Sequence, residues 1–375
     1  MDFDLRAHTH LLTVAGSRAY GVHTEASDVD VKGVAIPPAV YYHGISKTFE
    51  QADDADPIQV FMGDMSDEEQ AISARVKLEG SVYELRKFIR LAASANPNIM
   101  DVLFCRDEEV RVLTPLGAKL REHRNLFLSA RARYTFAGYA ASQLKRIKLH
   151  RRWLLHPPRA APLRSDFGLP EKTLIPKDQL AAANAAVRKR TDSWEVDFGA
   201  LEPAEVLRIQ ASIEGALTEI LATTDDRWKC AARGIGLSEN LIYVMQKERE
   251  YTAARREWQA YQGWKKHRNR ARAELEAKYS FDVKHGAHLY RLQKMCREII
   301  ETGEVRVWRG GYDAEEILAI RQGEWSYERL VAWSEAEEAT LTERMKSGPV
   351  AVPRVPDMEA IDALCQSLVE TALRG

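Results

Sequence analysis

The segment Asp28-Val29-Asp30-Val31 constrains the fold more than any other short stretch of this chain. Side chains alternate between the two faces of a β-strand, so Asp28 and Asp30 would share one face and the two valines the other. Two adjacent carboxylates repel each other unless a cation or solvent compensates them. We therefore expect a strand whose valines enter the core and whose aspartates line a polar surface.

The first part of the chain contains both strand-like and helix-like sequence patterns. Short runs rich in β-branched residues and broken by glycine predict strands at 11–16, 28–36, 56–64 and 75–80. A helical pattern begins after Ser81, the expected N-cap. A second helix is expected after Thr114, with Pro115 in its first turn. An N-terminal head over residues 1–127, with a small mixed sheet, is therefore predicted.

The rest of the chain has mostly helical patterns. A proline-punctuated loop is expected at about 156–177. Helices are expected near 129–153, 202–223, 237–279, 282–302, 313–321, 326–346 and 357–373. The fold class that follows is α+β, with the head followed by a mostly α-helical C-terminal domain over residues 128–375.

Composition excludes some classes of protein. With 45% hydrophobic and 29% charged residues the chain is globular, and it lacks any apolar run of about 18 residues that would predict a membrane span. The acidic N-terminus does not resemble a secretory signal, and the four cysteines form no CxxC pair. We expect reduced thiols and a cytoplasmic location. The oligomeric state is left open by the sequence.

Charge is unevenly distributed, although the formal net charge is only −1. Residues 251–294 are rich in Lys and Arg, including the run KKHRNRAR, whereas residues 53–69 are acidic. A basic stretch is compatible with an anionic partner such as RNA, and equally with a solvated helix face.

Ten residues separate Gly16-Ser17 from Asp28. Its backbone N–H groups and hydroxyl could hold a triphosphate, and a helix beginning there would add a favourable dipole. Mg²⁺ prefers one or two carboxylates together with substrate phosphates, so the order Gly-Ser, then Asp-Val-Asp, favours a metal–nucleotide site.

The same residues resemble the hallmark of the polymerase-beta-like nucleotidyltransferase superfamily, in which Gly-Ser is followed after about ten residues by Asp-hydrophobic-Asp. The block GSRAYGVHTEASDVDVKGV is similar to that of one branch, the RlaP-type proteins of RNA repair. VYELRKFIRLAASANPNIMDVLF and FDVKHGAHLYRLQKMCREIIETGEVRV resemble two further blocks of this branch. The resemblance extends over nearly the whole chain.

The resemblance implies transfer of NMP from an NTP to an acceptor hydroxyl, with release of pyrophosphate and two Mg²⁺ or Mn²⁺ ions. Asp28 and Asp30 would bind both ions. The superfamily uses a third carboxylate from a neighbouring strand, and Glu79 is our candidate for it, with Asp64 and Glu84 as rivals. Glu84 also suits an ordinary role at a helix start.

A second group of candidates lies in FDVKHGAHLYRL. Lys284, His288 and Arg291 would share one helical face, with His285 beside it. We interpret them as a cationic, hydrogen-bonding wall for the triphosphate or an acceptor phosphate; a solvated helix with core histidines is the alternative. The remaining substrate-binding candidates flank the Gly-Ser turn: Gly16, Ser17, Arg18, Tyr20 and Lys32.

Several functions fit these residues. The first is nucleotidyl transfer to RNA, in tRNA metabolism or RNA repair. The second keeps the chemistry but transfers to a protein or small-molecule hydroxyl, and the third is a non-catalytic nucleotide- or RNA-binding module. A two-metal phosphohydrolase would need more His and Asp ligands than the head offers. The preferred base is not predicted.

Overall fold

The computed structural model describes residues 2–374, except residues 25–26, 54, 77, 174, 193–223 and 269. The chain forms two compact units, each described here by itself. The first unit combines residues 1–155 with residues 270–375, and the second consists of residues 156–269.

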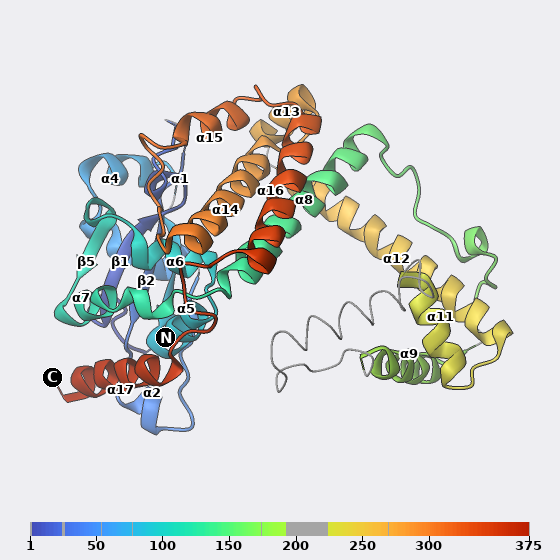
Figure 1. The fold of residues 1–375 in the computed structure, drawn as a ribbon, viewed down its shortest axis with the longest axis horizontal. Coiled ribbons are helices and arrows are strands. Elements are labelled where there is room, and N and C mark those ends of the chain that lie inside the picture. The colour runs from blue at the N-terminus through green and yellow to red at the C-terminus, as the bar shows by residue number, and fades with distance from the viewer. Residues whose placement is uncertain are drawn as a thin grey trace. The chain divides into compact units, whose positions relative to one another are not determined.

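Five strands form one mixed sheet in the order β3-β4-β2-β1-β5. Figure 1 shows β2, β1 and β5 of this sheet. They are β1 (Thr9–Ala15), β2 (Asp30–Ala35), β3 (Gln51–Ala52), β4 (Glu79–Glu84) and β5 (Val110–Leu113). β2 pairs with β1 antiparallel and with β4 parallel, whereas β5 and β3 add antiparallel edges. This small mixed sheet and the mostly helical body that follows confirm the α+β prediction.

Helices make up most of the remaining structure. In the N-terminal half they are α1 (Gly16–Ala19), α2 (Val40–His43), α3 (Ala55–Ile58), η1 (Gln59–Asp64), α4 (Asp67–Ser73), α5 (Leu85–Ala93), α6 (Pro97–Phe104), η2 (Asp107–Glu109), α7 (Pro115–Glu122), η3 (Arg124–Phe127), α8 (Ala132–Leu155), η4 (Arg164–Phe167) and α9 (Lys177–Asp192). They continue as α11 (Thr224–Gly234), α12 (Glu239–His267), α13 (Arg270–Tyr279), α14 (Val283–Thr302), α15 (Ala314–Arg321), α16 (Tyr327–Ser347) and α17 (Met358–Arg374).

Strand β2 separates two cores. Val31 is fully buried in a core with Ile58 and Phe61, while Val34, on the opposite face, joins the main core with the helices. Asp30 is two residues from Lys32 and four from Val34, so it shares the face of Val34. The predicted burial of the valines beside the aspartates is confirmed, because Val29 and Val31 are 2% and 0% exposed.

Helix α14 packs along α8, so the C-terminal part of the chain returns to the N-terminal part (Figure 1). Leu289, Leu292 and Cys296 of α14 are fully buried in the same core as Phe136 of α8. This packing joins residues 128–155 and 270–375 to the sheet in one unit. The predicted domain boundary between residues 127 and 128 stays a prediction.

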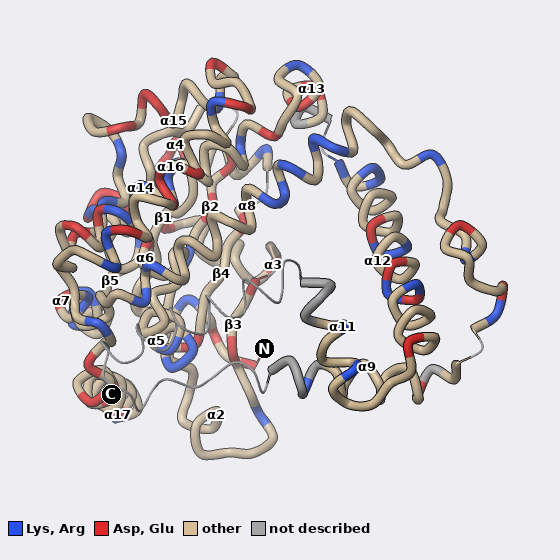
Figure 2. Tube along the Cα trace, turned by 45° about the vertical axis from the view of Figure 1, so that its right-hand side comes forward, with Lys and Arg blue, Asp and Glu red and all other residues tan. Residues whose placement is uncertain are grey.

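The second unit has its own small core, built from α9, α11 and α12. Val187, Trp228 and Met245 are among its buried residues. Arg164 and Glu248 form an ion pair within this unit, with Nη1 2.9 Å from Oε2. Along α12, basic and acidic residues are interspersed, and Lys265 and Lys266 lie near its end (Figure 2).

The strand predicted at 56–64 is wrong, because this segment forms α3 and η1. Ile58 and Phe61 are fully buried, whereas Val60 is 47% exposed. Burial of residues three apart is the spacing of a helix rather than of a strand. Apolar residues of the acidic segment 53–69 thus pack against the sheet.

The strand predicted at 75–80 is displaced, and Ser81 is not an N-cap. β4 begins at Glu79 and continues to Glu84, and the helix that follows begins at Leu85. Glu84 is the actual N-cap, because its side chain accepts a hydrogen bond from the backbone N–H of Lys87. Gly80 and Ser81 therefore lie inside β4, which pairs with β2.

Other boundaries were predicted more closely. Thr114 caps α7, with Pro115 in the first turn, as expected. The long helix predicted at 237–279 is two helices, α12 and α13, whereas the helix predicted at 202–223 lies outside the described residues. In the described ranges, no helix is both long and apolar enough to cross a membrane.

Candidate active site

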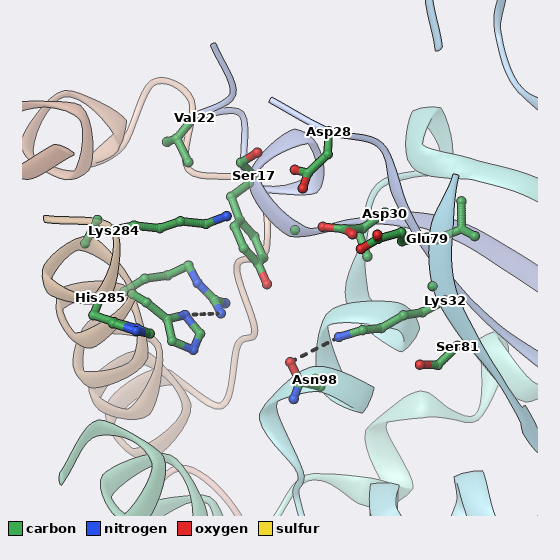
Figure 3. Close-up of a pocket in the computed structure, with 18 of the residues that line it drawn as sticks. Ser17, Val22, Asp28, Asp30, Lys32, Glu79, Ser81, Asn98, Lys284 and His285 are labelled. Carbon is green, nitrogen blue, oxygen red and sulfur yellow. Dashed lines mark hydrogen bonds between the residues drawn. The ribbon is translucent and has the colours of Figure 1, made fainter. Parts of the chain in front are cut away.

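The register of the sheet brings the predicted carboxylates together. Asp30 is aligned with Glu79 across the parallel β2–β4 pair, and with Ala15 across the antiparallel β1–β2 pair. Directly opposed residues in a sheet present their side chains on the same face. Figure 3 shows Asp28, Asp30 and Glu79 directed into one pocket. The cavity has a volume of about 730 Å³.

The turn that follows β1 requires glycine at position 16. Gly16 has φ +64°, in the left-handed region that residues with a Cβ rarely adopt. A Cβ built there would lie 2.8 Å from Oδ2 of Asp30. The backbone at Gly16 therefore approaches the Asp30 carboxylate closely, and the short helix α1 continues from it with Ser17 beside the pocket.

We predict that Gly16→Ala destabilises the protein and disturbs the site. The strained φ and the contact with Asp30 should together lower the free energy of unfolding by about 1–3 kcal/mol. Urea unfolding monitored by circular dichroism measures this loss. Gly168→Ala is the matched control for backbone strain alone, because Gly168 has φ +70° but no atom within 4 Å of its built Cβ. Equal losses in the two variants would contradict a specific contact with Asp30.

Negative charge is concentrated at Asp30. Burial raises the pKa of the Asp30 carboxyl, and the nearby charges of Asp28 and Glu79 raise it further, while Lys284 and Lys32 oppose the rise. A cation placed among these carboxylates would relieve both effects. Oxygen-only ligands of this kind fit a hard ion such as Mg²⁺.

The three carboxylates do not converge on one point. Within the described residues, His150, Glu276 and Asp282 form a set whose three possible ligand atoms lie within 4.8 Å of one another. Asp28, Asp30 and Glu79 do not form such a set. One ion could not contact all three pocket carboxylates in this conformation. A set of this kind suits two ions, or a movement of the side chains on binding.

The opposite side of the pocket is formed by α14. Lys284, His285, His288 and Arg291 all line it, as does Gln143 of α8. Lys284 is exposed and extends into the pocket toward the side of Ser17 (Figure 3). We find no hydrogen bond or ion pair of Lys284 with any other described residue. It is therefore available to an anion in the pocket.

Arg291 differs from Lys284, because its guanidinium is already engaged. Arg291 is 2% exposed, and its Nη1 donates to Oδ1 of Asp101 at 3.2 Å. The guanidinium also lies 3.7 Å from the ring centroid of Tyr20, whose hydroxyl donates to Oδ2 of Asp101 at 2.6 Å. This arrangement connects the Gly-Ser turn to α6 and α14. A direct contact of Arg291 with phosphate stays a prediction.

His288 is held in its neutral form. Burial, followed by the charge of Arg291, lowers the pKa of His288 to about 3. Its Nδ1 lies 3.2 Å from Nη2 of Arg291. Because guanidinium can only donate, Nδ1 accepts, and the ring proton is on Nε2. His288 thus presents a neutral N–H donor rather than a charge.

His285 pairs with the residue that caps its own helix. Its Nε2 is 3.5 Å from Oδ2 of Asp282, and Oδ1 of Asp282 accepts a hydrogen bond from the backbone N–H of His285 at 3.0 Å. Asp282 also belongs to the close group with His150 and Glu276. The carboxylate of Asp282 therefore orients His285 at the edge of the pocket.

Lys32 contributes a second cation on the strand side. Its Nζ donates to Oδ1 of Asn98 at 3.1 Å, and burial lowers the pKa of the ammonium (Figure 3). Arg18, in contrast, does not line the pocket. Its guanidinium contacts the backbone oxygen of Asp28 and Oε1 of Glu68, the latter at 3.2 Å.

The rival carboxylates have other partners. Oδ1 of Asp64 is 2.6 Å from Nη2 of Arg6, outside the pocket. Glu84 is 3% exposed and accepts hydrogen bonds from the Tyr42 hydroxyl and from Arg86, in addition to its capping role. Glu79 is the one of these three that reaches the pocket.

Six polar residues of the site were not predicted. Five of them line the pocket, namely Asp53, Ser81, Asn98, Gln143 and Arg321, and the sixth, Asp101, accepts a hydrogen bond from Arg291. Asn98 and Asp101 lie in the block VYELRKFIRLAASANPNIMDVLF, so the resemblance pointed to their segment without naming either side chain. Ser81 and Gln143 had none, because only the sheet register and the packing of α8 bring them to the pocket.

Comparison with known proteins finds a match to the N-terminal part of the chain. A family model described as RlaP, the RNA repair pathway DNA polymerase beta family, covers residues 6–154. Residues 6–154 match the RlaP family. The match confirms the predicted resemblance over these residues, which contain the Gly-Ser turn and all three candidate carboxylates. The RlaP match ends before α14, so Lys284 and the residues around it lie beyond it.

Neither the curated proteins nor the solved structures contain a significant match to this chain.

Proposed function

We propose that this protein is a metal-dependent nucleotidyltransferase that moves NMP from an NTP to an acceptor hydroxyl, with RNA as the expected acceptor. The observation that carries the proposal is one pocket with Asp28, Asp30 and Glu79 on its strand side and the available ammonium of Lys284 opposite. The RlaP match supports a polymerase-beta type of chemistry and a role in RNA repair.

In this proposal Asp28 and Asp30 hold two Mg²⁺ or Mn²⁺ ions. When bound, the ions would lower the pKa of the acceptor hydroxyl and neutralise the triphosphate. The N–H groups of the Gly16-Ser17 turn and the Lys284 ammonium would orient the phosphates. These groups would be in place before the reaction, so they would stabilise charge as it develops.

The reaction that follows is a displacement at phosphorus. The acceptor oxygen forms a bond to the α-phosphorus, and the bond from that phosphorus to the bridging oxygen of the β-phosphate breaks. Pyrophosphate leaves with the electron pair. Glu79 would accept the hydroxyl proton, because it is aligned with Asp30 and presents a carboxylate to the pocket.

Two other functions remain as outcomes of the test. The same chemistry could act on a protein or small-molecule hydroxyl, because the pocket described here does not identify the acceptor. A non-catalytic nucleotide- or RNA-binding module is less well supported, since it would have little need for Asp28, Asp30 and Glu79 in one pocket.

We expect label from one α-³²P-NTP to appear in RNA when the full chain is incubated with Mg²⁺ or Mn²⁺ and total RNA. Parallel reactions should contain total protein in place of RNA, or no added acceptor. Asp28→Asn/Asp30→Asn should lose the label, whereas Asp64→Asn should keep it, because Asp64 pairs with Arg6 outside the pocket. Label in protein alone would replace RNA by a protein acceptor. Tight NTP binding without any transfer would support the binding module.

A further inference from the structure

Two polar residues of α8, Arg133 and Gln143, are buried, and Gln143 is the one that stands between apolar residues at helical spacing. Phe136, Ala140, Gln143 and Ile147 follow helical spacing and are 0%, 1%, 8% and 0% exposed, respectively. Leucine or methionine would continue this apolar stripe. Gln143 is instead a long amide, and it lies where the stripe reaches the pocket.

The carbonyl end of this amide has no partner among the described residues. Oε1 of Gln143 is buried and accepts no hydrogen bond from any part of the chain that the structure describes. A buried acceptor without a donor is unfavourable, and such groups are rare in folded proteins. Gln143 lines the cavity, so a turn of its side-chain amide would bring Oε1 to an N–H or O–H donor on a ligand there.

The pocket also offers other uncharged hydrogen-bonding groups. Asn98 of α6 and Ser81 of β4 line it, and His288 contributes its neutral ring. These groups differ from the carboxylates and from Lys284, which suit metal ions and phosphates. A phosphate oxygen is an acceptor and cannot satisfy Oε1 of Gln143. A ligand group that satisfies Oε1 must therefore carry an N–H or O–H donor.

We propose that Gln143 recognises the base of the incoming nucleotide, by accepting a hydrogen bond from an N–H group on the edge of the base. This inference rests on the proposed nucleotidyl transfer and adds the residue that determines base preference. A side-chain amide combines an acceptor with two donors, so it can pair with a base edge that presents a donor beside an acceptor. A base at the end of the acceptor RNA has the same chemistry, and the experiment separates the two sources.

The test compares equilibrium binding of six ligands to the full chain: four NTP analogues, tripolyphosphate and a short RNA oligonucleotide that reports binding of the acceptor. Calorimetry with Mg²⁺ and each non-hydrolysable NTP analogue reports recognition of the base, whereas Mg²⁺-tripolyphosphate reports the phosphate site alone. Gln143→Leu removes the amide and completes the apolar stripe. Gln293→Leu is the matched control, because Gln293 is 3% exposed on α14, also has an unpaired Oε1 and does not line the pocket.

We expect Gln143→Leu to bind its preferred NTP analogue about tenfold more weakly and to lose preference among the four bases, with tripolyphosphate binding unchanged. Gln293→Leu should bind every ligand as the unaltered chain does. Unchanged NTP binding by Gln143→Leu would overturn the proposal. Weakened binding of the RNA oligonucleotide alone would also overturn it, because it would place a base of the acceptor at Gln143. If the unaltered chain binds neither tripolyphosphate nor NTP, the proposed function itself fails.

Discussion

Asp30→Asn should lower the rate of nucleotidyl transfer by at least about 10²–10³-fold while making the metal-free protein more stable. Asparagine keeps the shape of the side chain but removes the charge that would hold the ions, so electrostatic stabilisation of the transition state is lost. Single-turnover transfer measures the first effect, and thermal unfolding in EDTA measures the second. A lost activity accompanied by a lower Tm would indicate damage to the fold instead.

The increase in stability follows from the raised pKa of Asp30. A carboxyl whose pKa is higher in the folded state binds protons more readily there, so its ionisation opposes folding increasingly as the pH rises above the unfolded pKa, and fully above the folded pKa. At neutral pH we expect the Tm of Asp30→Asn to be about 2–4 °C higher. The difference should vanish as the pH falls below the unfolded value of 3.8, because Asp30 is then protonated in both states. Mg²⁺ should raise the Tm of the unaltered chain and not of the variant.

Arg291→Met should reduce the free energy of unfolding by about 3–5 kcal/mol, since it leaves a buried carboxylate without its cation. Arg291 and Asp101 are 2% and 3% exposed, so water compensates neither of them. Denaturant unfolding of the two single variants and of Arg291→Met/Asp101→Asn forms a complete cycle. The double variant should recover much of the loss, because it contains no unpaired charge, and the hydroxyl of Tyr20 keeps an oxygen acceptor at position 101.

The same variant has a functional readout that simple destabilisation would not give. Arg291 lies on the ring of Tyr20 and donates to His288, so it positions groups on both sides of the pocket. At a temperature where the variant is folded, we expect a lower kcat and a higher KM for NTP. Arg309→Met is the control: it removes the buried cation from Glu298 and Asp313, which do not line the pocket. Similar kinetic changes in both variants would contradict a positioning role for Arg291.

The sequence predicted best where short-range chemistry decides the structure. Alternation in Asp28-Val29-Asp30-Val31 was sufficient to place the valines in the core, and Thr114-Pro115 was sufficient to begin a helix. The segment 56–64 was predicted wrongly because its β-branched residues obscured the helical spacing of Ile58 and Phe61. Local propensity is a weak guide when burial against a sheet determines the outcome.

The arrangement of the pocket depends on contacts that a single sequence does not reveal. Asp101 and Arg291 are 190 positions apart, and only the packing of α14 makes them an ion pair. Gln143 likewise looks like any polar residue of a long helix until its burial is known. The identity of the third carboxylate stays a prediction, although the sheet register aligns Glu79 with Asp30.

The interleaving of the first unit has a consequence for protein synthesis. The strand side of the pocket is translated early, but Lys284 and His288 follow about 250 residues later, after the whole second unit. At typical rates of translation this interval is on the order of tens of seconds. A ribosome-bound nascent chain would therefore carry the carboxylates without the opposing helix. If the proposed chemistry is correct, the chain cannot modify nearby RNA before its own synthesis is nearly complete.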